Sequence, residues 1–409
     1  MRFIYIIFLA YFFLSSSCNT NKKLDPYVLL ISFDGFRAEY LDWYSTPHMD
    51  KFLKKGVRSE GLIPVFVSKT FPNHYSIATG LYVENHGLIG NQFYDSKFND
   101  YYTLSDRSKV EDPKFYGGEP IWVTAEKQGI NTASYFWVGT EAPIKNTFPS
   151  KWKKYEHNFP FESRIDSVVS WFSKPFKERP QLCMLYFHEP DATGHNTGPR
   201  SKETAFVVSK MDSLFGVLIK KLSSTPVYSN LNIIVLSDHG MAEISSKRTI
   251  RLDNYTNLKD INQEGAGPYA LLYGENKSRL QQTVKDLNKV DHIKAYLKKD
   301  IPERFHFKNH YRIKDVLVLA DEGWYIQNQA ISSNSKAGNY IPKGGTHGYD
   351  NQLKSMHALF LANGPVFQSG IKTEPFENVN IYPLICEILN ITPHPNIDGR
   401  LNNIRHILK

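Results

Sequence analysis

The chain has 409 residues, a formal net charge of +8 and 41% hydrophobic residues. This length and apolar content indicate a globular protein with one large domain or two, and they exclude a disordered chain. The Lys and Arg residues are scattered rather than gathered in one stripe, so we expect no specific nucleic-acid binding, whereas anionic small molecules are compatible with the charge. The sequence predicts no particular oligomeric state.

The amino terminus has the pattern of an export signal. Arg2 precedes an unbroken apolar run over residues 3–14, which is too short to span a bilayer as a stable helix. Three serines then precede Cys18, which resembles a bacterial lipoprotein signal, although Ser15 stands where such signals usually carry Leu. We expect residues 1–17 to be a signal peptide and Cys18 to be the lipidated first residue of a periplasmic or outer-membrane lipoprotein. Secretion without a lipid and an uncleaved anchor are the alternatives.

Short apolar runs and helical patterns alternate along the chain. Buried strands are predicted at residues 27–33, 62–67, 182–187, 231–236 and 358–362. Helices are predicted at residues 46–55, 161–172, 201–222 and 382–389. This alternation predicts an α/β fold with a mostly parallel central sheet and helices on both faces. Cys183 and Cys386 lie inside apolar runs, so we expect both to be buried without a disulfide.

Thr70 stands just before another predicted helix. Pro72 suits the first helical position, which would place Thr70 near the N-cap. Free backbone N–H groups and the positive end of the helix dipole make that a good position for binding a phosphate. Most threonines in such a position are ordinary helix caps, so Thr70 alone does not predict a site.

Metal-competent side chains follow three of the predicted strands directly. Asp34 follows the first strand, Asp191 and His195 follow residues 182–187, and Asp238 and His239 follow residues 231–236. Because the carboxyl ends of parallel strands meet at one edge of a sheet, we expect these side chains to lie close together.

The chain between His239 and His347 differs in composition from the rest of the sequence. It is polar and rich in Asn, Lys and Asp, with a predicted strand at 269–273, a helix at 280–289 and a loop at 330–345. We expect a cap or insertion at about residues 252–343 within a catalytic domain that spans residues 24–409.

The candidate metal ligands form a mixed set of carboxylates and imidazoles. They are Asp34, Asp191, His195, Asp238, His239 and His347. Such a set suits Zn²⁺ better than Ca²⁺ or Mg²⁺, which prefer oxygen ligands. One catalytic zinc typically has about three protein ligands, so six fit two ions that share a substrate, about 3.5–4 Å apart. A threonine hydroxyl on Zn²⁺ loses its proton readily, which makes Thr70 a candidate nucleophile toward phosphorus.

Seven stretches then carry a resemblance to a known family. They are residues 32–37 (SFDGFR), 69–74 (KTFPNH), 87–92 (GLIGNQ), 136–139 (FWVG), 189–195 (EPDATGH), 237–241 (SDHGM) and 345–349 (GTHGY). In this set and order they resemble the nucleotide pyrophosphatase/phosphodiesterases of the alkaline phosphatase superfamily. One departure is Val138, where the family often has Pro.

The resemblance implies an alkaline phosphatase-like fold and two Zn²⁺ ions. One ion would be held by Asp191, His195 and His347, and the other by Asp34, Asp238 and His239 with Thr70. Thr70 would attack phosphorus in line, and water would hydrolyse the phosphothreonine intermediate. Asn91 would donate its amide to a phosphate oxygen, which supports the developing charge. The positions that match the family's nucleobase clamp are Phe71, Tyr155 and Tyr186, and for Tyr186 and Trp137 a role in the core is an equal alternative.

We therefore expect a hydrolase that cleaves nucleotide phosphodiester or pyrophosphate bonds and releases nucleoside 5′-monophosphates. Residues 135–141 offer no Lys or Arg for the extra charge of a monoester, which favours a diester. A phosphomonoesterase and a phospholipase C-like choline-lipid phosphodiesterase are alternatives within the superfamily. An inactive surface lipoprotein that binds a ligand at the same site is the alternative from another class.

Overall fold

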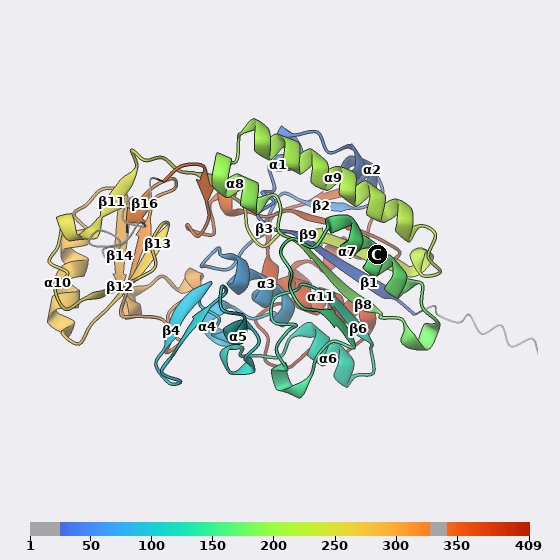
Figure 1. Cartoon of the computed structure of the whole chain (residues 1–409), viewed down its shortest axis with the longest axis horizontal. Helices are drawn as coiled ribbons and strands as arrows, with labels where there is room; N and C mark the ends of the chain where they lie inside the picture. Colours follow the sequence, from blue (N-terminus) through green and yellow to red (C-terminus); the bar gives the residue numbers. More distant parts are fainter. Residues whose placement is uncertain (1–24, 328–341) are drawn as a thin grey trace, which may run out of the picture.

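An eight-stranded sheet forms the centre of the protein (Figure 1). The computed structural model describes residues 25–327 and 342–409. In spatial order the strands are β19 (Ile371–Thr373), β2 (Val57–Ser59), β18 (Phe360–Asn363), β9 (Leu231–Leu236), β1 (Tyr27–Phe33), β8 (Leu182–Phe187), β6 (Thr132–Tyr135) and β7 (Lys151–Lys153). From β9 to β7 all neighbours are parallel, whereas β18 runs antiparallel to both of its neighbours. The predicted mostly parallel α/β sheet is confirmed.

The three central strands are buried along their whole length. Successive side chains of β1 point to opposite faces of the sheet, so Val28 and Leu30 enter one hydrophobic cluster, whereas Leu29 and Ile31 enter another. Both faces are therefore covered, which explains why these strands read as continuous apolar runs.

Helices cover both faces of this sheet (Figure 1). On one face lie α2 (Pro47–Leu53), α7 (Phe161–Phe172) and α9 (Lys202–Leu222), and on the other lie α3 (Thr70–Thr79), α6 (Ile121–Lys127) and α11 (Ile381–Leu389). Further helices in this part of the protein are α1 (Tyr40–Trp43), α4 (Val83–His86), α5 (Arg107–Val110) and α8 (Asp191–Thr197). The predicted helices are present, with ends that shift by a few residues.

The strand predicted at residues 62–67 is wrong. Only β3 (Leu62–Ile63) forms, and it pairs with β20 (Phe376–Glu377) outside the main sheet. Pro64 has no N–H to donate to a ladder. Beyond it, the Asn73 side chain takes the place of a neighbouring strand, because its oxygen accepts from Val65 N at 2.7 Å and its amide donates to Val67 O at 3.0 Å.

A second, smaller sheet lies beside the main one (Figure 1). Its antiparallel strands, in order, are β12 (Asn262–Glu264), β13 (Tyr269–Tyr273), β15 (Val316–Ala320) and β14 (Ile293–Leu297), with α10 (Lys277–Leu287) packed in the same cluster. Two further two-stranded sheets are formed. In one, β11 (Thr249–Arg251) pairs with β16 (Tyr325–Gln327), and in the other, β10 (Ala242–Glu243) pairs with β17 (Gly345–Thr346). The predicted 269–273 strand is confirmed, and the predicted 280–289 helix is α10, which begins earlier because Asn276 caps it.

A buried ion pair ties this insertion to the main domain. Arg312 Nε lies 2.6 Å from Asp95 Oδ2, and both side chains are almost fully buried. Asp95 ends β4 (Gln92–Asp95), which forms a hairpin with β5 (Asp100–Thr103). The hairpin therefore connects the insertion with the region around Asn91.

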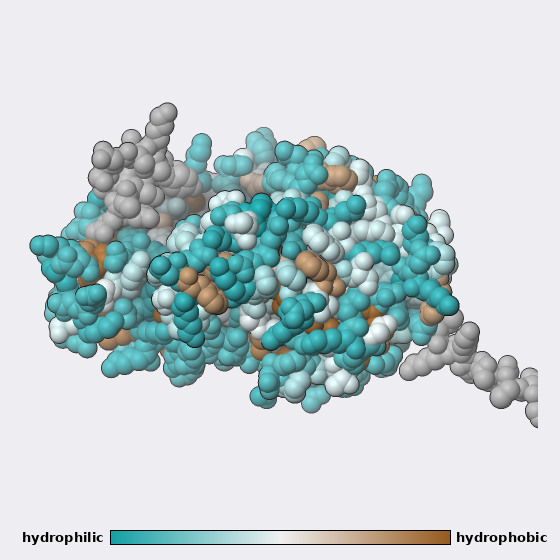
Figure 2. All heavy atoms as spheres, turned by 60° about the horizontal axis from the view of Figure 1, so that its bottom comes forward, coloured by the Kyte–Doolittle hydropathy of each residue, from teal (hydrophilic) through white to brown (hydrophobic). Residues whose placement is uncertain are grey.

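Among the described residues, no helix has the length and apolar character needed to cross a membrane. The face in Figure 2 is mostly hydrophilic, with small separate apolar patches. The predicted signal peptide at 1–17, Cys18, and most of the predicted 330–345 loop lie outside the described residues.

Candidate active site

Thr70 is the first residue of α3. Lys69 occupies the N-cap with an extended backbone, so Thr70 lies inside the helix and Pro72 is its third residue. The predicted first position of Pro72 is therefore wrong, whereas Thr70 lies next to the N-cap, as expected, and its hydroxyl lies in the first turn. Its Oγ1 is 3.3 Å from His239 Nε2, which brings it to the edge of the main sheet.

Two groups of metal-competent side chains meet at that edge. They are Asp34, Asp238 and His239, and Asp191, His195 and His347. Within each group the ligand atoms all lie within 4.8 Å of one another. Asp34 directly follows β1, Asp238 and His239 follow β9, and Asp191 and His195 lie on α8 after β8, so the parallel strand ends gather them as expected.

In each of the three histidines, Nε2 faces the ligand groups, because Nδ1 faces a backbone carbonyl oxygen. Nδ1 of His195 faces Gly345 O at 2.9 Å, Nδ1 of His239 faces Gly240 O at 2.8 Å, and Nδ1 of His347 faces Ser68 O at 2.7 Å. A carbonyl oxygen only accepts, so each Nδ1 carries the proton and donates it. In the neutral ring, Nε2 then presents a lone pair to the ligand group, as metal-binding histidines do.

Among the residues that the structure describes, one oxygen of each carboxylate in the two groups lacks a hydrogen-bond donor. Asp34 Oδ1, Asp191 Oδ1 and Asp238 Oδ2 are buried and have no hydrogen-bond partner within the described chain. Burial, followed by the charges of Asp238 and Asp191, raises the pKa of Asp34 well above its usual value. Buried negative charge and facing lone pairs are unfavourable without a cation. The six side chains therefore fit divalent metal ions, and their mixture of nitrogen and oxygen ligand atoms suits Zn²⁺.

Hydrogen bonds from neighbouring residues hold the group of Asp34, Asp238 and His239 in place. The Tyr186 hydroxyl donates to Asp34 Oδ2 at 2.5 Å, and Gly35 N donates to Asp238 Oδ1 at 3.2 Å. Gly35 has φ +67°, and a Cβ there would lie 2.7 Å from Asp191 Cβ. Glycine at this position therefore permits the close approach of the two triads.

Asn91 lies next to the start of α3. Phe71 N donates to Asn91 Oδ1 at 3.0 Å. Because a backbone N–H only donates, the atom facing it must be the carboxamide oxygen. The Asn91 NH₂ group remains as a donor, and Asn91 lines the same cavity as Thr70.

That cavity has a volume of about 350 Å³. It is lined by Thr70, by four members of the ligand groups and by aromatic side chains. The four are Asp34, Asp191, His195 and His347, and the aromatic residues are Phe71, Phe136, Trp137, Tyr155 and Tyr186. Phe71, Tyr155 and Tyr186, the predicted clamp residues, thus line the same cavity as Thr70. The Tyr186 hydroxyl is engaged by Asp34, and Trp137 is buried with its Nε1 donating to His74 O at 3.1 Å.

Other lining residues were not singled out from the sequence. They are Leu104, Arg107, Val110, Glu141, His157 and His188. Arg107 supplies the cation that residues 135–141 lack, and it is paired with Glu141. In the sequence it stands in a polar stretch next to other charged residues, so no sequence signal marks it.

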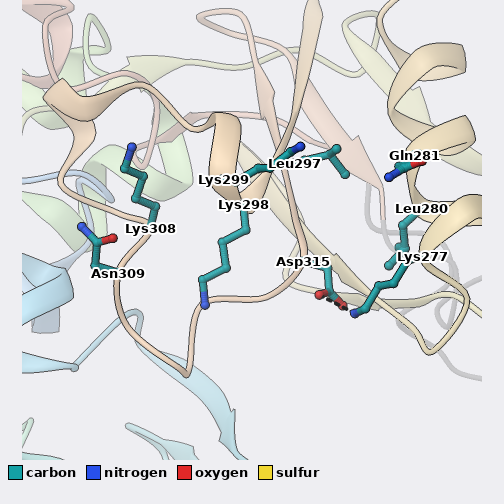
Figure 3. A pocket seen from close by; sticks show the side chains of 9 residues that line it. All are labelled: Lys277, Leu280, Gln281, Leu297, Lys298, Lys299, Lys308, Asn309 and Asp315. Carbon is teal, nitrogen blue, oxygen red and sulfur yellow. Dashed lines mark hydrogen bonds and ion pairs between the residues drawn. The ribbon is translucent and has the colours of Figure 1, made fainter.

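A larger cavity of about 670 Å³ lies on the insertion (Figure 3). Three of its four lysines have partners: Lys277 pairs with Asp315 at 2.7 Å, Lys298 donates to His310 O at 2.7 Å, and Lys308 pairs with Glu303. The ammonium groups of Lys298 and Lys308 point in opposite directions (Figure 3), so this cavity does not gather charge around a ligand.

Comparison with known proteins is consistent with this geometry. The family model described as type I phosphodiesterase/nucleotide pyrophosphatase matches residues 28–350. The bis(5′-adenosyl)-triphosphatase of Pongo abelii is 39% identical over 387 residues, which cover 92% of this chain and 81% of that protein. Ectonucleotide pyrophosphatase/phosphodiesterase family member 3 of Bos taurus is 39% identical over 403 residues, which cover 96% of this chain and 45% of that protein. The chain thus spans about half the length of the bovine relative.

Solved structures agree in fold. The murine ectonucleotide pyrophosphatase/phosphodiesterase 5, in an inactive variant in complex with AMP, has a TM-score of 0.86 and 35% identity, and the match covers 94% of this chain and 100% of that one. The human protein of the same name gives a TM-score of 0.87 at 35% identity, with 94% and 100% covered. The sequence, the fold and the arrangement of the strand ends agree, and the chain belongs to the type I phosphodiesterase/nucleotide pyrophosphatase family.

Proposed function

We propose that the protein hydrolyses phosphodiester or pyrophosphate bonds of nucleotides and releases nucleoside 5′-monophosphates. The observation that carries this proposal is the position of the Thr70 hydroxyl, 3.3 Å from His239, in a cavity that joins two metal-competent triads to aromatic walls. The names of the relatives and the AMP complex of the murine protein support the same substrate class.

Two Zn²⁺ ions are part of the proposal. Asp34, Asp238 and His239 with Thr70 would hold one ion, and Asp191, His195 and His347 would hold the other. The ions would lower the pKa of the Thr70 hydroxyl and of a water molecule, and they would neutralise charge on the phosphate.

Thr70 acts as the nucleophile in this mechanism. Its Oγ1 forms a bond to phosphorus while the bond to the leaving group breaks, which leaves a phosphothreonine ester that carries the nucleoside. Water then breaks the bond between Thr70 and phosphorus and releases the nucleoside 5′-monophosphate. Two in-line displacements give net retention at phosphorus.

The first turn of α3 and Asn91 would stabilise charge on the phosphoryl group. The positive end of a helix dipole favours an anion, and α3 begins at Thr70 itself. The Asn91 NH₂ group adds a donor that the hydrogen bond from Phe71 N orients. Phe71 and Tyr155 would stack on the base, which contributes roughly 1–3 kcal/mol per base.

A substrate panel tests this function. The zinc-loaded protein should hydrolyse a dinucleoside polyphosphate and bis-p-nitrophenyl phosphate much faster than p-nitrophenyl phosphate or p-nitrophenylphosphorylcholine. A preference for the monoester or for the choline ester would replace the proposal with one of the two alternatives in the superfamily. A folded, zinc-loaded protein with no turnover of any ester would favour the inactive ligand-binding lipoprotein.

We also propose export and lipid attachment at Cys18, from the sequence of residues 1–23. Labelled palmitate should appear on the wild-type protein and not on Cys18→Ala. A mature protein without the lipid would favour secretion instead.

A further inference from the structure

His74 lies in α3 one turn after Thr70, and its side chain is fully buried. Its ring contacts three different parts of the fold. Nδ1 lies 3.0 Å from Thr70 O, and Nε2 lies 2.8 Å from the hydroxyl oxygen of Ser32 on β1. Nδ1 is also 3.5 Å from Oδ2 of Asp238, which follows β9. One imidazole thus joins the residue that carries the proposed nucleophile to the central sheet and to a predicted metal ligand.

The direction of each hydrogen bond follows from the chemistry of the partners. The carbonyl oxygen of Thr70 only accepts, so Nδ1 of His74 carries the proton and donates it. In the neutral ring Nε2 only accepts, so the Ser32 hydroxyl is the donor. Ser32 therefore selects the tautomer whose Nδ1 proton faces Thr70. The same N–H lies close to Asp238 Oδ2, a buried oxygen without a hydrogen-bond partner in residues 25–327 and 342–409.

The ring of His74 is held by the groups packed around it. The ring centres of Trp137 and Tyr186 lie 5.1 and 5.2 Å from that of His74, and both rings meet it edge-on. Trp137 Nε1 also donates to His74 O at 3.1 Å. Ser32 is equally fixed, because it pairs with Tyr186 in β8 and with Leu236 in β9. The imidazole is therefore in position before any substrate arrives.

Thr70 and Asp238 meet at two histidines. Thr70 Oγ1 lies 3.3 Å from His239 Nε2, and the same Nε2 lies 2.9 Å from Asp238 Oδ2. His74 supports this arrangement from the other side, because it contacts the backbone of Thr70 and the same oxygen of Asp238. A misplacement of about 1 Å can reduce the rate of a reaction by about 10²-fold. The position of the His74 ring therefore matters for the distance between the Thr70 hydroxyl and the ligand group.

We propose that Ser32 and His74 position Thr70 for attack on phosphorus by fixing it against Asp238. This inference rests on the proposed function, in which Thr70 is the nucleophile. Both side chains are 0% exposed, so they act through Thr70 and Asp238 and not by contact with the substrate. No proton passes through His74 in this account, because its Nδ1–H stays with a carbonyl oxygen that takes part in no bond change.

Steady-state kinetics of the zinc-saturated full-length protein tests this role, with bis-p-nitrophenyl phosphate as the substrate. Ser32→Ala removes the donor to Nε2, so kcat should fall about tenfold, whereas AMP affinity, measured by calorimetry, should change less than about twofold. His74→Gln has an amide that reaches the position of Nε2 but not that of Nδ1, and its kcat should fall about a hundredfold. His74→Asn places an amide nitrogen near the position of Nδ1, where it can donate to Thr70 O, and should recover much of this loss.

Ser76→Ala is the matched control. Ser76 lies in the same helix, and its Oγ is 2.8 Å from Nε2 of another buried histidine, His86. This variant also removes a serine–histidine hydrogen bond, but one that does not reach Thr70, so kcat should stay unchanged. Equal losses of kcat for Ser32→Ala and Ser76→Ala, or a His74→Asn variant as slow as His74→Gln, would overturn the inference.

Two further measurements do not depend on turnover. Nitrogen-15 NMR should find the ring proton of His74 on Nδ1. Zinc affinity should fall by about 10–100-fold in His74→Gln and stay unchanged in Ser76→Ala, because only His74 supports the ligand group. A proton on Nε2, or unchanged zinc affinity in His74→Gln, would overturn the inference. Absence of phosphodiester hydrolysis by the wild-type protein would instead overturn the proposed function, and these two measurements would still decide whether His74 holds Thr70 and Asp238.

Discussion

His195 Nε2 and His347 Nε2 lie 3.1 Å apart, although the hydrogen bond of each Nδ1 to a carbonyl oxygen leaves both Nε2 atoms with lone pairs. Two lone pairs at this distance repel each other unless a cation lies between them. Burial, followed by the neighbouring His239 and Lys69, lowers the pKa of His347 well below its usual value, so protonation of His347 does not provide that cation.

Removal of metal should therefore abolish activity and reduce stability. Chelation takes away the positive charge that offsets the buried carboxylates, so the melting temperature should fall by several degrees. Zn²⁺ should restore both properties. Elemental analysis of the restored protein should give two zinc equivalents, and a single equivalent would contradict the two-metal proposal.

Thr70→Ala should reduce turnover at least about a thousand-fold, because it removes the proposed nucleophile. Thr70→Ser is the control, since it keeps a hydroxyl. Circular dichroism and zinc content should stay near those of the wild type, because the other ligands remain. Retained hydrolysis of bis-p-nitrophenyl phosphate by Thr70→Ala would refute the assignment.

Asn91→Ala should lower kcat by about 10²–10³-fold with a smaller change in KM, the pattern for loss of a donor that acts on transition-state charge. Asn91→Asp keeps the acceptor for Phe71 N but loses the NH₂ group, so it separates the two roles. If Asn91→Asp retained full kcat, the NH₂ group would have no part in the reaction.

Tyr186→Phe removes the hydrogen bond to Asp34 but keeps the ring. If the hydroxyl orients a zinc ligand, zinc affinity should fall by about 10–100-fold, whereas AMP binding to the zinc-saturated variant should stay the same. Weaker AMP binding with unchanged zinc affinity would instead favour direct contact between the hydroxyl and the substrate.

Acid should destabilise the protein through His86. Burial, followed by the charges of His310 and Arg312, lowers the pKa of His86 to about 3, against 6.5 for an ordinary histidine. Its Nδ1 accepts from Leu88 N at 3.1 Å, so the folded protein requires the neutral ring. Below pH 6.5 the unfolded chain binds a proton that the folded chain does not, and stability should fall by up to about 1.4 kcal/mol per pH unit until about pH 3.

The His86→Asn variant isolates this effect. Asn keeps an acceptor for Leu88 N but does not titrate in this range. Denaturant unfolding between pH 4 and pH 7 should show a shallower dependence on pH for the variant than for the wild type. Identical slopes would exclude His86 as a source of acid sensitivity.

The sequence predicted those elements of the fold that a single strong local pattern marks. Strand β1 is apolar on both faces and is followed by Asp34. Its apolar run predicted its burial, and the end of that run predicted the position of Asp34 at the edge of the sheet. The strand predicted at 62–67 failed because the side chain of Asn73, which local patterns do not reveal, satisfies the backbone there. The short strands β6 and β7 carry no long apolar run and were missed.

The same reasoning applies to the candidate site. Five of its six ligands follow the ends of parallel strands, which the rule for parallel sheets brings together, whereas His347 follows β17 in a short antiparallel pair. Arg107 reaches the cavity through a hairpin whose position depends on long-range contacts such as the Arg312–Asp95 ion pair, so its sequence neighbours could not place it. The orientation of Asn91 likewise depends on the backbone of Phe71.

The central claim is that Thr70 attacks phosphorus. The most direct measurement is mass spectrometry of the zinc-loaded protein, quenched with acid during turnover of a dinucleoside polyphosphate. We predict a nucleoside monophosphate adduct on the peptide that contains Thr70, and none on the Thr70→Ala variant. An unmodified Thr70 throughout turnover, together with inversion of configuration at phosphorus, would show that water attacks directly and would contradict the account.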